Sequence, residues 1–173
     1  MKFAMYCLAA SCVYGAEMDV AQMVKDFEGE RLTVYVDSLG NPTIGVGFNL
    51  RRKDARDRLT AVGADYEAIL AGNASLTSRQ SQELFEFCLA EATAAARSIF
   101  LTFNQQHEEV QAILIDMSYN LGSRLRQFTK FRRAINSMDY VAAANALVDS
   151  KWYRQVGRRS EHHVSVLLLR GVE

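Results

Sequence analysis

The chain has 173 residues, a formal net charge of zero and 49% hydrophobic residues. This length and composition exclude a disordered chain and favour one domain, or two small lobes, around a packed core. The neutral balance is also unlike most nucleic-acid-binding proteins, so we expect no nucleic-acid partner. Because there is one proline and the apolar residues recur mostly at helical spacing, we predict an α+β fold that is mainly α.

Residues 1–15 have the features of a secretory leader. Lys2 precedes an uncharged apolar stretch, and small residues precede a cleavage position before Ala16. The stretch is shorter than the about 20 residues of a membrane-spanning helix, so we expect no stable membrane anchor. The sequence therefore predicts a secreted protein, with a buried first helix, a lipoprotein leader or the releasable anchor of a phage lysis enzyme as alternatives.

The first half of the chain predicts a helix, a hairpin and two short helices. Apolar residues at helical spacing from Val20 to Phe27, with Asp19 as the cap, predict a helix that ends at Glu28-Gly29. The β-branched run 32–36, the turn residues 38–42 and the extended run 43–48 predict a β-hairpin. Short helices are expected over 52–62 and 65–71.

The second half predicts a long helix followed by a helical bundle. Thr77 and Gln80 form a capping box for a helix that reaches about residue 100. Segment 110–121 is apolar on most sides, which indicates a buried central helix ended by Gly122. Further helices are expected over 128–137, 139–149 and 159–169. We therefore predict a two-lobed molecule, with a sheet-containing lobe over about 28–75 and a helical lobe over about 76–173 that includes the first helix.

Two carboxylates and a hydroxyl flank the predicted hairpin turn. Glu28 lies where the first helix ends, Asp37 follows the first strand, and Thr43 begins the second arm of the hairpin. A carboxylic acid, an ionised carboxylate and a hydroxyl in one cleft are what the acid-catalysed cleavage of a glycosidic bond requires. Each residue alone has an ordinary structural explanation, as a helix end, a turn acid or a strand residue. Glu30 is a rival acid, although its place beyond Gly29 predicts that it is exposed.

The order of several motifs resembles the phage-type lysozymes, the muramidases similar to the T-even bacteriophage enzyme. The resemblance rests on E-G-x-R-L-x-x-Y-x-D-x-x-G-x-x-T-I-G-x-G from residue 28, L-T-S-R-Q-S-Q-E-L-F at 76–85, M-S-Y-N-L-G at 117–122 and S-K-W-Y-R-Q-V-G-R-R at 150–159. It implies a two-lobed lysozyme fold over residues 16–173. It also implies an enzyme that cleaves the β-1,4 bond between N-acetylmuramic acid and N-acetylglucosamine in bacterial peptidoglycan.

The same resemblance implies roles for individual residues. Glu28 matches the general acid, Asp37 the second carboxylate and Thr43 the hydroxyl that positions water. Arg159 matches an arginine that pairs with the acid, and Tyr119 an aromatic residue of the sugar cleft. Inversion of configuration is then expected, with the two carboxyl groups roughly 6.5–9.5 Å apart to admit a water.

The chain departs from the phage pattern after G-V-G, where Phe48-Asn49 stands in place of His-Leu. Asn49 is therefore a candidate sugar contact of this chain. Together with the leader, the resemblance favours a secreted, monomeric lysozyme with antibacterial activity, for which defence, digestion and phage lysis are all compatible purposes.

Other kinds of protein fit the sequence less well. A zinc amidase needs metal ligands, but His107, His162, His163 and the one mature cysteine do not make a convincing set, so we expect no metal and no cofactor. Cys88 falls on the apolar stripe of the long helix, where a buried thiol is expected rather than a nucleophile. A lytic transglycosylase would not need Asp37. The main alternative is a non-enzymatic, cationic wall- or membrane-binding protein, because residues 124–133 hold five basic side chains and no acidic one.

Overall fold

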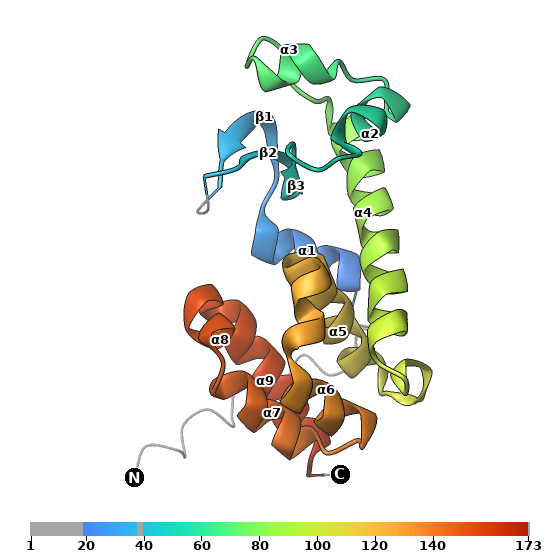
Figure 1. The fold of residues 1–173 in the computed structure, drawn as a ribbon, viewed down its shortest axis with the longest axis vertical. Helices are drawn as coiled ribbons and strands as arrows, with labels where there is room; N and C mark the ends of the chain where they lie inside the picture. The colour runs from blue at the N-terminus through green and yellow to red at the C-terminus, as the bar shows by residue number, and fades with distance from the viewer. Residues whose placement is uncertain (1–18, 38–39, 173) are drawn as a thin grey trace.

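The computed structural model describes residues 19–37 and 40–172. The leader predicted over residues 1–15 lies outside this range, as do the turn residues Ser38 and Leu39. Figure 1 shows two lobes, one with the sheet and one made of helices, connected by the long helix α4 (Ser78–Ile99). The predicted mainly helical α+β architecture is therefore confirmed.

The sheet lobe contains three short strands and two short helices. The strands β1 (Arg31–Val36), β2 (Pro42–Gly45) and β3 (Phe48–Asn49) form an antiparallel sheet in the order β1-β2-β3. They are followed by α2 (Ala55–Ala61) and α3 (Tyr66–Leu70). The helix α1 (Val20–Glu28) precedes the sheet and lies between the lobes (Figure 1).

The prediction of one continuous second hairpin arm over 43–48 was wrong. Val46 and Gly47 form a turn, so the run is divided between β2 and the two-residue strand β3. Gly47 has a φ of 72°, a conformation that glycine adopts without the steric cost that other residues incur. The alternation of apolar residues over 43–48 did not reveal the turn, because the alternation continues from one extended segment to the next across a tight turn.

The helical lobe holds two 3-10 helices and five α-helices after α4. They are η2 (Phe103–Gln105), α5 (Glu108–Leu121), η3 (Gly122–Gln127), α6 (Thr129–Asn136), α7 (Tyr140–Val148), α8 (Lys151–Val156) and α9 (Arg158–Arg170). Sequence reasoning did not predict α8, η2 or η3.

The predicted helix ends are formed by local hydrogen bonds. The Asp19 side chain accepts from the backbone N–H groups of Ala21 and Gln22 at the start of α1. Thr77 and Gln80 make both bonds of the capping box at the start of α4. These interactions involve residues two or three positions apart, so the sequence alone was enough to place them.

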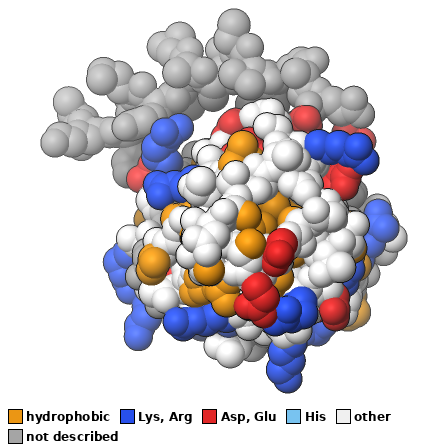
Figure 2. Space-filling view, turned by 90° about the horizontal axis from the view of Figure 1, so that it is seen from above, with side chains coloured by type: hydrophobic (Ala, Val, Ile, Leu, Met, Phe, Trp, Pro, Cys, Tyr) orange, Lys and Arg blue, Asp and Glu red, His pale blue; other side chains and the backbone are white. Residues whose placement is uncertain are grey.

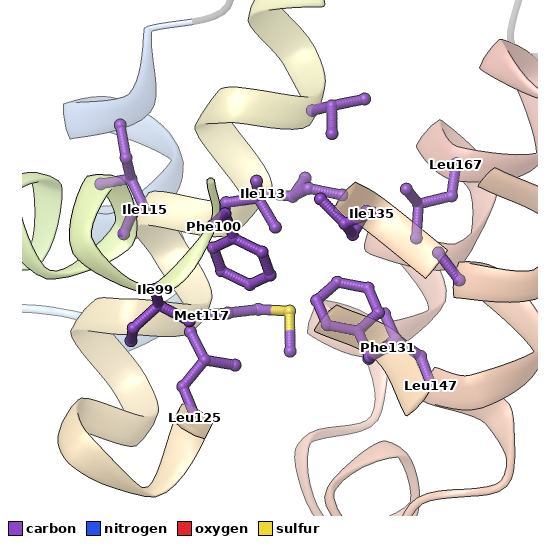
Figure 3. Close-up of a cluster of buried hydrophobic side chains, with 14 of the residues drawn as sticks. Ile99, Phe100, Ile113, Ile115, Met117, Leu125, Phe131, Ile135, Leu147 and Leu167 are labelled. Carbon is purple, nitrogen blue, oxygen red and sulfur yellow. The ribbon is translucent and has the colours of Figure 1, made fainter. Parts of the chain in front are cut away.

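The largest hydrophobic core lies inside the helical lobe. Figure 3 shows the rings of Phe100 and Phe131 next to each other within it. The two rings are arranged edge to face, with centroids 5.9 Å apart and an interplanar angle of 86°. Ile113, Leu114 and Met117 of α5 are fully buried in the same core, as expected for a central helix. A second core, which includes Ile44, Leu59 and Leu84, lies under the sheet.

A third small cluster joins the lobes. Val24 of α1, Val46 of the β2–β3 turn and Phe85 of α4 are buried together there. Tyr119 packs against this cluster and against both larger cores. The two lobes therefore meet around α1 and Tyr119, next to the end of α1 where Glu28 lies.

The surface does not gather one sign of charge on the face at the sheet-lobe end. Figure 2 looks onto this face and shows basic and acidic side chains, the basic ones mostly around its rim. Among the residues that the structure describes, no helix has the length and apolarity needed to cross a bilayer.

Candidate active site

A cleft of about 910 Å³ opens between the lobes. Residues of the sheet, of α4 and of the helical lobe line it. Of the residues singled out in the sequence, Glu28, Asp37, Thr43, Asn49 and Tyr119 all line this cleft. The fold thus brings together side chains that the sequence separates by up to about ninety positions.

Glu28 is the last residue of α1, and its position depends on two glycines. Gly29 ends the helix with a φ of 71°, and its N–H bonds to the Lys25 carbonyl. A Cβ atom at Gly47 would lie 3.1 Å from Glu28 Oε2, so any side chain there would crowd the carboxyl. The Glu28 side chain keeps 20% of its surface exposed. It is therefore held firmly but remains accessible from the cleft.

The sheet presents a row of side chains to the cleft. Thr43 in the middle strand pairs with Tyr35 on one side and with Asn49 on the other. Paired residues in neighbouring strands share a face of the sheet, so these three side chains lie side by side. All three line the cleft. Tyr35 was not recognised in the sequence as a site residue, although its place opposite Thr43 follows from the hairpin register.

Asp37 is held by the turn that it begins. Its Oδ1 accepts from the Asn41 backbone N–H at 2.8 Å, and its Oδ2 accepts from Asn41 Nδ2 at 3.1 Å. Thr43 Oγ1 donates to the Asn41 carbonyl at 3.1 Å, and the Thr43 side chain is almost fully buried. Asn41 thus fixes both the carboxylate and the hydroxyl on the sheet side of the cleft.

On the helical side, a buried arginine holds Glu28. Arg159 Nη1 donates to Glu28 Oε1 at 2.7 Å, although 131 positions separate the two residues. Arg159 Nε and Nη2 donate to the two carboxylate oxygens of Asp116, each at 2.7 Å. All three nitrogens of the guanidinium are therefore bound to carboxylates, and Arg159 lies behind the cleft wall rather than in it.

A histidine completes this network. His163 Nε2 lies 2.7 Å from Asp116 Oδ2, and both side chains are fully buried. His163 Nδ1 has no hydrogen-bond partner among the described residues. The geometry fits a neutral imidazole that donates from Nε2, because a protonated ring would bury an unpaired N–H.

The protonation states follow from burial and from these contacts. Burial lowers the pKa of His163, which keeps the ring neutral. Burial opposes ionisation of Asp116, but the bonds from His163 and Arg159 outweigh it and lower the Asp116 pKa. Burial opposes the charged form of Arg159, and the bonds to Asp116 and Glu28 outweigh this and raise its pKa. A charged Arg159 thus lies between two carboxylates.

Two more side chains position Glu28 and close the site. Asn120 Nδ2 lies 3.4 Å from Glu28 Oε1, and Asn120 Oδ1 accepts from Trp152 Nε1 at 2.8 Å. Trp152 belongs to α8, the short helix that sequence reasoning missed. The motifs that contain Asn120 and Trp152 were noticed in the sequence, but nothing in their spacing showed that the two residues bond to each other.

Tyr119 lines the cleft but has a second contact. Its hydroxyl donates to the Val46 carbonyl at 2.5 Å, across the junction between the lobes. Burial raises the pKa of the Tyr119 phenol well above its usual range. The ring therefore forms part of the cleft wall, while the hydroxyl connects α5 to the sheet lobe.

The other candidates considered in the sequence lie outside the cleft or are buried. Glu30 is exposed, as predicted, and accepts from Ser81 Oγ at 2.6 Å. Cys88 is buried, and burial raises its pKa to about 11, which disfavours a reactive thiolate. Within residues 19–37 and 40–172, no three His, Cys, Asp or Glu side chains are grouped so that they could hold a metal ion.

The basic segment 124–133 does not form one continuous surface. Arg124 and Arg126 line the cleft, whereas Lys130 and Arg133 line a separate hollow of about 460 Å³ on α6 and α7. The segment therefore contributes positive charge to the cleft on one side and to an unrelated surface on the other.

Comparison with protein families agrees with this geometry. The family model described as phage lysozyme matches residues 25–168 of the chain. The chain therefore belongs to the phage lysozyme family and is a lysozyme, an enzyme class that hydrolyses peptidoglycan.

Individual relatives are similar at modest identity. The chain is 27% identical over 153 residues to Probable T4-type lysozyme 2 of Dictyostelium discoideum, covering 83% of this chain and 90% of that protein. It is 30% identical over 126 residues to the endolysin of Salmonella phage P22, covering 72% of this chain and 75% of that protein. It is 27% identical over 164 residues to the pre-baseplate central spike protein Gp5 of Enterobacteria phage T4, covering 90% of this chain. The match spans only 28% of that longer spike protein.

Proposed function

We propose that this lysozyme cleaves the β-1,4 bond after N-acetylmuramic acid with inversion of configuration, with Glu28 as general acid and Asp37 as the base that activates a water. The observation that carries the proposal is the placement of both carboxyl groups on one cleft, Glu28 from the helical side and Asp37 from the sheet side.

Glu28 suits the acid because it is held but accessible. Its Oε1 is bound by Arg159, while Oε2 lies close to Gly47, where the absence of a side chain leaves the cleft open. When the proton moves to the glycosidic oxygen, the carboxylate that forms already has a guanidinium at 2.7 Å. The charge that develops is thus stabilised without a rearrangement of the site.

Asp37 and Thr43 suit the activation of water. Asn41 donates to both Asp37 carboxylate oxygens, which favours the ionised form that a base requires. The Thr43 hydroxyl donates its hydrogen bond to the Asn41 carbonyl, so its lone pairs can accept a hydrogen bond from a water. A carboxyl separation of roughly 6.5–9.5 Å would be the distance expected for this inverting reaction.

The cleft walls fit a sugar polymer that carries carboxylates. Tyr35, Asn49 and Trp152 supply aromatic and amide surface, and Arg124 and Arg126 supply positive charge on the helical side. Asn49 and Tyr119 would then contact sugar rings. We further propose that the protein is exported after cleavage near Ala16, acts as a monomer and has an antibacterial role. Mass spectrometry of the extracellular form tests the cleavage site, and an intact Met1 there would refute it.

The test is product analysis of digested peptidoglycan with two isosteric variants. Glu28→Gln should lower kcat by about 10²–10⁴-fold, because the proton donor is lost while the hydrogen bond from Arg159 is kept. Asp37→Asn should lower hydrolysis by about 10²-fold or more. Reducing ends of inverted configuration are expected from the unmodified enzyme.

Asn73→Ala is the matched control, because Asn73 lies in the loop between α3 and α4 and does not line the cleft. Full hydrolysis by Glu28→Gln would refute the assignment of the acid. Anhydro-sugar products from Asp37→Asn would mean a transglycosylase. Antibacterial activity that survives both variants would favour the non-enzymatic binder.

A further inference from the structure

The network behind Glu28 contains two ionisable residues that the proposed reaction does not use. Asp116 of α5 and His163 of α9 are both fully buried, and neither lines the cleft. A buried charge destabilises a fold unless it is paired, so such residues need a structural or functional reason. Their contacts suggest one, because Asp116 binds two nitrogens of the guanidinium whose third nitrogen binds Glu28.

The net charge of the cluster formed by Glu28, Arg159, Asp116 and His163 depends on whether Glu28 carries a proton. With Arg159 positive, Asp116 negative and His163 neutral, the cluster has no net charge while Glu28 carries a proton. It carries one negative charge when Glu28 is ionised. The state with a proton on Glu28, in which the cluster has no net charge, is the one in which a general acid must begin its reaction.

We propose that Asp116, oriented by His163, is a positioning residue that holds Arg159 on Glu28 and cancels its charge, so that the acid can keep its proton. The inference depends on the proposed role of Glu28. Without Asp116, the full charge of Arg159 would act on Glu28 and favour the ionised carboxylate, which cannot donate a proton.

His163 has a specific part in this arrangement. Its Nε2–H donates to Asp116 Oδ2, the oxygen that also accepts from Arg159 Nε. The burial that lowers the His163 pKa keeps the ring neutral, so His163 orients Asp116 without adding a positive charge. A protonated ring would cancel the charge of Asp116 and leave Arg159 to act on Glu28 unopposed.

Other ionisable groups that face the network come from several elements. Tyr35 of β1 and Tyr119 of α5 interact electrostatically with Glu28, and Tyr35 also with Asp37 and Arg31. His162 of α9 interacts with Asp116 and His163, and burial lowers its pKa. None of these groups is seen to bond to the guanidinium, whereas Asp116 binds it directly through two hydrogen bonds.

The main experiment is the pH profile of peptidoglycan hydrolysis for Asp116→Asn. In the unmodified enzyme, activity falls at the alkaline side where the acid loses its proton. Replacing Asp116 by the uncharged, isosteric Asn should move this alkaline limb to lower pH by about one unit, which is about a tenfold loss at neutral pH. The activity at the acidic optimum should fall much less. An alkaline limb that stays in place or moves to higher pH would overturn the proposal.

Two further variants separate charge from structure. His163→Gln keeps a donor for Asp116 and no charge, so its alkaline limb should stay within about 0.3 unit of the original. A shift as large as that of Asp116→Asn would overturn the assignment. Glu109→Gln is the matched control, because Glu109 and Arg170 form another ion pair between α5 and α9. It should leave the limb where it is, and a limb that moves with it would show that helix packing, rather than Asp116, sets the profile.

A measurement on the unmodified protein does not depend on whether the variants fold. The nitrogen-15 signals of His163 should show a neutral ring with its proton on Nε2 between pH 6 and 8. A protonated His163 at pH 7 would overturn the proposal. Failure of the proposed function looks different, since Glu28→Gln would then remain active. Failure of this inference alone leaves Glu28→Gln inactive and the Asp116→Asn profile unshifted.

Discussion

The two walls of the cleft are built in opposite ways. On the sheet side, Asp37 and Thr43 are fixed by Asn41, a residue within four positions of both. On the helical side, Glu28 is fixed by Arg159, which is 131 positions away, and Arg159 is fixed by Asp116 of another helix. The sheet wall is thus a local structure with solvent access, whereas the helical wall depends on the whole fold and on buried charges.

This contrast indicates what each wall contributes. Asp37, the proposed base, lies in a turn where a backbone and an amide group donate to its carboxylate, and such bonds favour the ionised form that a base requires. Glu28, the proposed acid, instead lies next to the cation Arg159, which also binds a second carboxylate, that of Asp116. The proposed base is thus held by the groups of a turn, and the proposed acid by charged groups buried between helices.

Arg159→Leu should give the largest loss of stability, about 3–5 kcal/mol in the free energy of unfolding, because it leaves the buried Asp116 without its cationic partner. Asp37→Asn should cost less than about 1 kcal/mol, since its contacts are local and close to solvent. Urea unfolding measures both variants. Arg170→Leu, at the partly buried pair with Glu109, is the matched control and should cost about 1 kcal/mol. Equal losses for the two walls would show that both depend equally on the rest of the fold.

Gly47→Ala should destabilise by about 1–2 kcal/mol, because alanine resists a φ of 72°. It should also impair hydrolysis, since its Cβ would lie 3.1 Å from Glu28 Oε2. Gly72→Ala is the matched control, with a φ of 75° and no atom within 4 Å of the added Cβ. Thermal unfolding and turnover should show similar destabilisation for both variants but reduced activity only for Gly47→Ala. If both lose activity equally, the contact with Glu28 is unimportant.

Tyr119→Phe should lower stability by about 1 kcal/mol, because the Val46 carbonyl loses its donor where the two walls meet. It should also lower activity by weakening the connection between the walls. Tyr140→Phe removes a similar buried bond, to Gln106 Oε1 at 3.0 Å, but inside the helical lobe. Comparable stability with a difference in turnover would support the connection. Unchanged turnover in Tyr119→Phe would show that the walls keep their spacing without it.

Acidification should produce the smallest change. Burial lowers the folded-state pKa of His163 and of His162 below that of the unfolded chain, so the unfolded state binds more protons as the pH falls through about 6.5. Their contribution to stability is therefore complete above that pH and is lost below it. Between pH 7.5 and 6.0 the loss is at most about 0.8 kcal/mol for each histidine. Chemical denaturation at the two pH values measures it, and His163→Gln should reduce the loss. A stability that rises on acidification would contradict the neutral, buried ring.

Most helices could be predicted from the sequence, because their signals are local. Asp19, Thr77 and Gln80 cap α1 and α4 as expected, and the burial of Cys88 follows from its place on the stripe of α4. Short elements give only a weak pattern, which was enough to predict α3 but not α8 or the β2–β3 turn. Trp152 was therefore not placed in the site.

By itself, the sequence determined most of the helices, the presence of a hairpin and the identity of the residues in the family motifs. These features depend on interactions between residues a few positions apart, and such interactions produce recognisable patterns in the sequence. Only the tertiary structure decided that Asp116 and His163 support Arg159, and that Asn120 and Trp152 support Glu28. Such contacts form only when helices that are far apart in the sequence pack together, because packing then brings their buried polar groups within hydrogen-bonding distance.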